Sequence, residues 1–179
     1  MNLCVYCSSY ENLNPEFFTA CETFGHEIAR RGHTLIYGGY NKGIMGAVAG
    51  SVAKEGGKII AVVPKLFDTD DFMFEGCTEV IHTEDIRERK EQFELKSDAF
   101  VVLPGGVGTM DELFDTMALI NVGELEKKPI AILNVRGCYD HLEGLLRNFV
   151  KEGFLFQREL DNIRFYNDVS ELIDGLEKK

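Results

Sequence analysis

Short apolar runs alternate with longer amphipathic stretches along most of the chain. Several runs are apolar at nearly every position, which is typical of parallel strands covered on both faces. The stretches between them carry apolar residues at helical spacing and end in glycine or polar residues. The predicted strands are LCVYC, HTLIYGG, KIIAVVP, EVIHT, AFVVLP, PIAILNV and IRFYN. Helices are predicted over Pro15–Arg31, GIMGAVAGSVAKEGG, residues 84–97, Thr109 to about Gly123, residues 139–152 and residues 168–177.

The order of these elements indicates the fold class. A strand followed each time by a helix predicts an α/β protein with a doubly wound, Rossmann-like parallel sheet and helices on both faces. An irregular acidic segment is expected at 65–78, and no linker or repeat divides the chain, so residues 1–179 form a single predicted domain. Sheets of this kind bind ligands beyond the carboxyl ends of their strands, at a topological switch point.

Net charge narrows the choice of partners. The 30 acidic against 19 basic residues give a formal charge of −11, which argues against a nucleic-acid partner because phosphate backbones demand clustered cations. A small phosphorylated ligand remains possible, since a pocket acts through direct charge-assisted hydrogen bonds. The apolar runs are too short for a membrane span, and the first residues do not resemble a signal peptide. We therefore expect a cytoplasmic protein without a membrane partner.

The cysteines and histidines do not indicate a metal site. Cys4 and Cys7 form a C-x-x-C pattern, but they lie on a predicted strand and would point to opposite faces of the sheet. A second pair that could complete a zinc site is missing. We expect the five cysteines to be buried or half-buried free thiols, and we expect no metal site.

Two glycine-rich loops follow predicted strands, YGGYNKGIMG at 37–46 and PGGVGT at 104–109. Loops that lead into helix N-termini collect anions on their backbone N–H groups. Neither loop has the spacing of the dinucleotide G-x-G-x-x-G or the G-K-[ST] of a P-loop. The pattern therefore fits a phosphate site, but it also fits a plain tight turn.

Two cations interrupt the predicted core face of the helix at 84–97. This face carries Ile86, Arg89, Lys90, Phe93 and Ser97. Cations on an apolar face must reach either solvent or an anion. One interpretation is a surface helix with an Asp85–Arg89 pair, and the other directs Arg89 and Lys90 into a cleft beside the PGGVGT loop.

Glu112 also has two interpretations. Thr109-x-x-Glu112 fits a capping box, in which the glutamate serves only the start of its own helix. A carboxylate beside an anion site would also suit a phosphorylated sugar, because N–H groups hold the phosphate while the carboxylate faces the hydroxyls. Local pattern alone favours the cap.

Several motifs together resemble the Lonely Guy (LOG) family of cytokinin riboside 5′-monophosphate phosphoribohydrolases. The family's P-G-G-x-G-T-x-x-E corresponds without a gap to Pro104–Glu112, and its R-K pair corresponds to Arg89 and Lys90. VYCSS, YGGYNKGIMG, IIAVVPK, KPIAILNVRGCYD and EGF match in order, so that the resemblance covers nearly the whole chain.

The resemblance implies a homodimeric enzyme that hydrolyses the N-glycosidic bond of adenosine-type or other purine nucleoside 5′-monophosphates, without a cofactor. Free base and ribose 5-phosphate are the products. By position, Arg89 and Glu112 would be the catalytic pair. The implied substrate-binding residues are Ser9, Gly38, Gly39, Asp71, Lys90, Gly105, Gly106, Val107, Gly108, Thr109, Met110 and Asp111.

This sequence departs from the family pattern around the part that would hold the base. Asp71 stands where the family has Glu, Tyr40 replaces the third glycine of Y-G-G-G, and Ala118 replaces a Thr. The base is therefore open between a cytokinin and plain AMP or another purine. Two further classes stay open as alternatives: a nucleotide- or cofactor-binding carrier, and, against the acidic composition, a nucleic-acid-processing relative. Proteins with this motif have also been called lysine decarboxylases, but the sequence assigns no lysine to pyridoxal phosphate.

Overall fold

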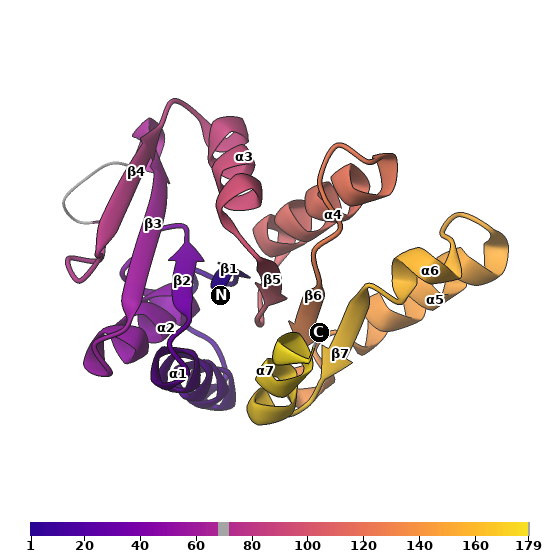
Figure 1. Cartoon of the computed structure of the whole chain (residues 1–179). Helices are drawn as coiled ribbons and strands as arrows, with labels where there is room; N and C mark the ends of the chain where they lie inside the picture. The colour runs from indigo at the N-terminus through magenta and orange to yellow at the C-terminus, as the bar shows by residue number, and fades with distance from the viewer. Residues whose placement is uncertain (68–71, 179) are drawn as a thin grey trace.

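Seven strands form one parallel sheet in the computed structural model, which describes residues 1–67 and 72–178 (Figure 1). The strands are β1 Asn2–Tyr6, β2 Thr34–Tyr37, β3 Lys58–Pro64, β4 Glu79–Thr83, β5 Ala99–Val102, β6 Ile130–Leu133 and β7 Ile163–Tyr166. Their order in the sheet is β4-β3-β2-β1-β5-β6-β7. The chain thus winds outward from β1 in one direction and from β5 in the other, which confirms the doubly wound prediction. The topological switch point lies between β1 and β5.

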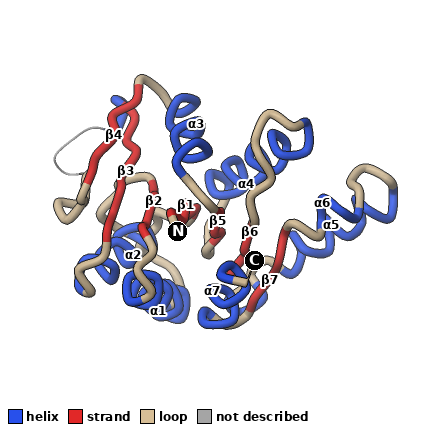
Figure 2. The backbone as a smooth tube through the Cα atoms, viewed as in Figure 1, coloured by secondary structure: helices blue, strands red, loops and turns tan. Residues whose placement is uncertain are grey.

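Helices cover both faces of the sheet (Figures 1 and 2). Residues of α1, α2 and α7 form one buried cluster with the sheet, and residues of α3, α4, α5 and α6 form the other. The helices are α1 Pro15–Arg30, α2 Gly43–Lys54, α3 Ile86–Lys96, α4 Val107–Val122, α5 Asp140–Glu152, α6 Gln157–Leu160 and α7 Val169–Glu177. Two short 3₁₀ helices follow β3 and β6, at Lys65–Phe67 and Val135–Gly137. The sequence analysis predicted neither of these nor α6.

Successive side chains of β1 point alternately into the two cores, one on each face of the sheet. Leu3, Val5 and Cys7 pack in the core beneath α1 and α2, whereas Cys4 packs in the core beneath α3 and α4. Cys4 and Cys7 therefore lie on opposite faces, as predicted. All five cysteines are free thiols, but Cys138 is exposed, so the expectation of burial was wrong there. Cys138 lies in the turn before α5, outside the core.

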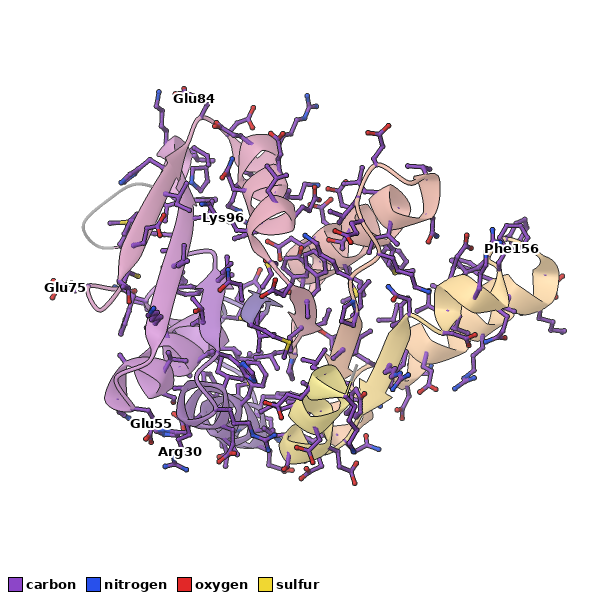
Figure 3. All side chains as sticks on the ribbon, viewed as in Figure 1. Arg30, Glu55, Glu75, Glu84, Lys96 and Phe156 are labelled. Atoms are coloured by element: carbon purple, nitrogen blue, oxygen red, sulfur yellow. The ribbon has the colours of Figure 1, made fainter. Side chains whose placement is uncertain are left out.

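Close contacts fix α1 and α2 against each other and against the end of β1. A Cβ atom on Gly25 of α1 would lie 2.7 Å from the carbonyl oxygen of Val48 in α2, so only glycine allows this approach. The Arg30 guanidinium donates to Glu55 at 2.8 Å where the two helices end, at the lower edge of Figure 3. At the other end of α2, Gly43 has a φ of +61°, and a Cβ there would lie 2.4 Å from the carbonyl carbon of Ser9. The loop after β1 is thereby held at the start of α2.

Helix boundaries differ from the predictions in two places that matter for the site. Helix α4 ends at Val122, close to the predicted end near Gly123, and Gly123 is its left-handed C-cap; the helix begins at Val107, two residues before Thr109. In α3, the Asp85 carboxylate caps the first turn by accepting from the amides of Arg87 and Glu88. Both differences move charged side chains relative to the sequence-based interpretation.

Candidate active site at the switch point

Three loops meet at the carboxyl edge of the sheet, beyond β1, β2 and β5. The amide of Ser8, after β1, donates to the carbonyl of Pro104, after β5, at 3.1 Å. The carbonyl of Ser8 accepts from the amide of Met45 in α2 at 3.2 Å. These bonds join the two central strands across the switch point, where a doubly wound sheet places its ligand.

The PGGVGT loop leads into α4, whose first turn has no side-chain cap. Gly106 is the N-cap and provides no side-chain acceptor for the amides of the first turn. A Cβ on Gly105 would lie 2.1 Å from the Thr109 Oγ1 atom, so the buried threonine packs directly under the loop. At Gly106 and Gly108 the corresponding space is open to 4 Å. The N-terminal amides of α4 therefore remain available to an anion.

The capping-box interpretation of Glu112 was wrong. Because the helix begins at Val107, Glu112 lies in its second turn, beyond the reach of the N-cap amide. Thr109 is within the helix and is buried, and Glu112 is also buried. A buried carboxylate in mid-helix must be stabilised by something other than the helix start.

The partner of Glu112 is Arg89. The Arg89 Nη2 atom donates to the Glu112 Oε1 atom at 2.6 Å, and the two side chains are only 12% and 7% exposed. The guanidinium lies over the Phe93 ring, 5.3 Å from its centroid, and a Cβ on Gly38 would lie 3.4 Å from its Nη1 atom. The buried Nε atom of Arg89 has no hydrogen-bond partner in the described part of the chain. Arg89 thus holds a spare donor at the switch point.

These contacts decide between the two interpretations of α3. Arg89 pairs across to α4, while the Asp85 side chain caps its own helix, so the surface-pair interpretation was wrong. Phe93 and Ser97 are buried as expected, but Ile86 is 41% exposed. Ile86 is the first residue of the helix, and the face that packs inward begins only with Arg89.

Lys90 makes a second, more exposed connection between α3 and α4. Its Nζ atom lies 3.3 Å from Asp111 Oδ2 and 3.1 Å from Asp115 Oδ2. Partial burial acts to lower the pKa of Lys90, but the ion pairs with Asp115 and Asp111 outweigh it and raise the pKa. A lysine with a raised pKa is a poor candidate for a Schiff base, which requires the neutral amine.

Burial raises the pKa of Glu112 to about 7, although the neighbouring Arg89 guanidinium acts to lower it. A carboxyl group that titrates near neutrality can act in proton transfer, and in its ionised form it can stabilise positive charge. One helical turn further on, Thr116 exchanges a buried 2.9 Å hydrogen bond with the hydroxyl of Tyr6 from β1. This bond fixes the segment of α4 that carries Glu112.

The remaining sequence-predicted residues fall into three groups. Loops at the switch-point edge hold Ser9, Gly38, Gly39, Gly105 and Gly106, and the first turn of α4 holds Gly108 and Thr109. A shallow groove of about 400 Å³ on the outer side of α4 is lined by Val107, Met110 and Asp111, together with Phe114, Asp115 and Ala118. The side chains of the second group therefore face away from Glu112, and only their amides could serve the same ligand. Asp71 lies outside the described residues.

Sequence reasoning missed Tyr139, whose hydroxyl donates to the carbonyl of Leu103 at 2.8 Å. Tyr139 precedes α5, which follows the carboxyl end of β6. Polar or aromatic residues just after a strand of a parallel sheet reach the ligand edge, and that position was the available signal.

A larger hollow of about 690 Å³ lies at the amino ends of β6 and β7, beside α7. It is on the wrong edge for a ligand of a parallel sheet. The charged residues around it, such as Lys127 and Arg164, are exposed surface side chains. The switch point is therefore the better candidate site.

In the described part of the chain, no three or more His, Cys, Asp or Glu side chains are grouped as metal ligands. Likewise, none of the helices within 1–67 and 72–178 combines the length and the apolar character that crossing a bilayer requires.

Fold and site together define a doubly wound α/β protein with a buried Arg89–Glu112 pair at its switch point, near a helix N-terminus without a side-chain cap. A family model described as possible lysine decarboxylase matches residues 45–176. The chain is 34% identical over 175 residues to the probable cytokinin riboside 5′-monophosphate phosphoribohydrolase LOGL3 of Oryza sativa subsp. japonica, covering 98% of this chain and 82% of that one. Identity to LOG3 of Arabidopsis thaliana is 32% over 176 residues, covering 98% and 81%. The chain belongs to the Lonely Guy (LOG) family.

Solved structures share the fold at lower identity. A molybdenum cofactor binding protein from Rippkaea orientalis superposes with a TM-score of 0.73 and 19% identity, covering 98% of this chain and 94% of that one. The molybdenum cofactor carrier protein of Chlamydomonas reinhardtii gives a TM-score of 0.73 and 19% identity, covering 99% and 96%. At this identity the likeness establishes only the architecture.

The raised pKa of Glu112 predicts a pH-dependent cost to stability. Between the ordinary value of 4.5 and about 7, the folded protein keeps a proton that the unfolded chain has released. Its contribution to the free energy of unfolding therefore falls as pH rises through this window. Glu112→Gln removes the effect, so the melting temperature of the variant minus that of the parent should be higher at pH 8 than at pH 5. We expect a difference of at least ~2 °C, the shift that about 1 kcal/mol produces in a domain of this size.

Glu75→Gln is the control, because Glu75 is exposed and points away from the molecule (Figure 3). It should follow the parent at both pH values. If the melting temperatures of Glu112→Gln and the parent change in parallel with pH, Glu112 does not titrate in this window.

Proposed function

We propose that this protein hydrolyses the N-glycosidic bond of purine nucleoside 5′-monophosphates, releasing free base and ribose 5-phosphate. The buried Arg89–Glu112 pair beside the open N-terminus of α4 is the observation that carries the proposal. This arrangement combines a site for an anion with a carboxyl group whose pKa lies near 7. Membership of a family whose curated relatives are named phosphoribohydrolases supports the same reaction.

The 5′-phosphate is assigned to the α4 N-terminus and to Arg89. The first-turn amides carry the positive end of the helix dipole, and Gly106 leaves them uncapped. Arg89 adds a full charge and a spare Nε donor. Charge-assisted hydrogen bonds of this kind contribute roughly 1.5–3 kcal/mol each. Binding energy from the phosphate can therefore position the ribose for reaction.

Phosphate binding would also change the state of Glu112. In the free protein the carboxylate and the guanidinium satisfy each other at 2.6 Å. A phosphate that shares the Arg89 donors releases part of the Glu112 carboxylate toward the ribose. Lys90, held by Asp111 and Asp115 at the edge of the same two helices, would supply further positive charge nearby.

In the reaction, the bond between C1′ and the base nitrogen breaks while a water oxygen bonds to C1′. The ribose passes through a state with oxocarbenium character, as in glycoside hydrolysis. Ionised Glu112 stabilises that positive charge and accepts the proton that the water loses. The leaving base takes up a proton from solvent, and Glu112 returns the proton it accepted to solvent, so that the products are neutral base and ribose 5-phosphate.

A second copy of the chain is the proposed partner. Val107 and Phe114, which line the shallow groove on α4, are 88% and 36% exposed, and Val122 at the end of the helix is 73% exposed. Apolar side chains on the outward side of a helix are typical of a subunit interface. Because α4 carries Glu112 on its inner side, the single interface of such a homodimer would lie next to both sites.

A panel of nucleoside 5′-monophosphates tests the proposed reaction, with released base measured by chromatography. AMP and other purine monophosphates should be cleaved, and adenosine should react far more slowly, because it lacks the phosphate that Arg89 and α4 would hold. Comparable rates on AMP and adenosine would remove the phosphate assignment. Tight binding of AMP without release of adenine would instead indicate a carrier, the alternative function with this fold.

Glu112→Gln tests the acid directly. A neutral amide of the same shape cannot stabilise an oxocarbenium-like ribose or accept a proton, so AMP turnover should fall by ~10²-fold or more. The variant should remain folded and dimeric by thermal unfolding and light scattering, because Gln can still accept a hydrogen bond from Arg89.

Glu94→Gln is the matched control. Glu94 is also a buried carboxyl group whose pKa is raised to about 7, chiefly by burial and the nearby Asp115, but Arg89 pairs with Glu112 instead. This variant should keep most of the parent activity. Equal losses in both variants would show that burial of charge between these helices, and not a chemical role of Glu112, determines the rate.

A further inference from the structure

The loop after β5 is attached on two sides in alternation. The carbonyl of Leu103 accepts from the Tyr139 hydroxyl at 2.8 Å, and the carbonyl of Gly105 lies 3.4 Å from the same hydroxyl. Between them, the carbonyl of Pro104 accepts from the amide of Ser8 at 3.1 Å. Beyond the end of β5 the chain bends at Pro104, and its carbonyls are held by Tyr139 on the β6 side and by Ser8 on the β1 side.

This alternation sets the direction of an amide that no side chain caps. In a planar trans peptide group, the carbonyl and the N–H point in opposite directions. The Gly105 carbonyl faces Tyr139 on the β6 side, so the N–H of Gly106 in the same peptide group faces the β1 side. That side is the switch-point crevice, where Arg89 lies against Gly38.

We infer that Tyr139 is a positioning residue for phosphate binding: its single hydroxyl proton is shared between the carbonyls of Leu103, at 2.8 Å, and Gly105, at 3.4 Å, and this contact aims the Gly106 N–H into the crevice. The inference rests on the proposed function and adds a residue, located after the neighbouring strand β6, that touches the binding loop but not the substrate. Gly105 is clamped from below by Thr109, whose Oγ1 atom would lie 2.1 Å from a Cβ at that position. Tyr139 supplies the lateral restraint that Thr109 cannot.

Tyr139 is itself held firmly. Its amide donates to the Asn134 Oδ1 atom at 2.7 Å, and the Asn134 amide group donates to Asp140 Oδ1 at 2.7 Å. Asn134 follows β6 directly, and its own backbone amide is bonded to the carbonyl of Tyr166 in β7 at 2.7 Å. Burial raises the pKa of the Tyr139 phenol, so the hydroxyl stays protonated and remains a donor throughout the working pH range. These bonds anchor Tyr139 to the ends of β6 and β7, and its hydroxyl in turn holds the loop after β5.

Tyr139→Phe removes the hydroxyl and keeps the ring. The expected result is a weakening of ribose 5-phosphate binding by about tenfold or more in isothermal titration calorimetry, with a similar rise in KM for AMP. Affinity for adenine, which lacks a phosphate, should be unchanged. A purely structural role would lower both affinities together with the melting temperature.

Tyr166→Phe is the matched control, because the Tyr166 hydroxyl packs against Gly175 of α7, away from the β5 loop. It should bind ribose 5-phosphate like the parent. Unchanged ribose 5-phosphate affinity in Tyr139→Phe, or equal losses for ribose 5-phosphate and adenine, would overturn the inference while leaving the proposed function in place. A parent protein that neither binds nor cleaves any nucleoside monophosphate would overturn both.

Discussion

The proposed site depends on one buried ion pair between Arg89 of α3 and Glu112 of α4. Taking both charges out of water is costly, and each is tolerable only because the other is present. Removal of a whole side chain from such a pair typically costs roughly 3–5 kcal/mol, whereas Glu112→Gln keeps an acceptor for Arg89 and removes the cost of burying the ionised carboxylate. The pair therefore holds α3 against α4. It also places beside the switch point the cation and the acid that nucleotide cleavage would require.

The topology of the sheet explains why these two helices meet there. Helix α3 comes directly before the central strand β5 in the sequence and α4 comes directly after it. Both helices pack in the same core. Parallel strands place their carboxyl ends on one edge, which brings the loops after β1, β2 and β5 to that pair. The more exposed contacts of Lys90 with Asp111 and Asp115 join the same helices on the solvent side. The site is thus a consequence of fold order and of a few charges on two helices.

The sequence predicted the architecture well because nearly continuous apolar runs have few alternatives to buried parallel strands. It predicted the start of α4 wrongly because Thr109-x-x-Glu112 has the spacing of a capping box, while the true N-cap, Gly106, has no side chain to signal it. The predicted core face of α3 was partly wrong, because periodicity identifies which residues share a face but not where along the helix burial begins. Ile86, the first residue of the helix, is therefore exposed. The position of Tyr139 just after β6 pointed to the ligand edge, but its bond to Leu103 could not be predicted, since the bond spans 36 residues and depends on the neighbouring positions of β5 and β6.

Kinetics of Arg89→Lys on AMP, with a thermal unfolding curve for the same protein, test the central claim most directly. Lysine keeps the positive charge, and with it a partner for Glu112, but it lacks the planar fork of donors that would serve Glu112 and a phosphate together. The account predicts a folded variant whose AMP turnover falls by ~10²-fold or more. Full activity in that variant would contradict it, because the buried guanidinium would then be only a structural partner of Glu112.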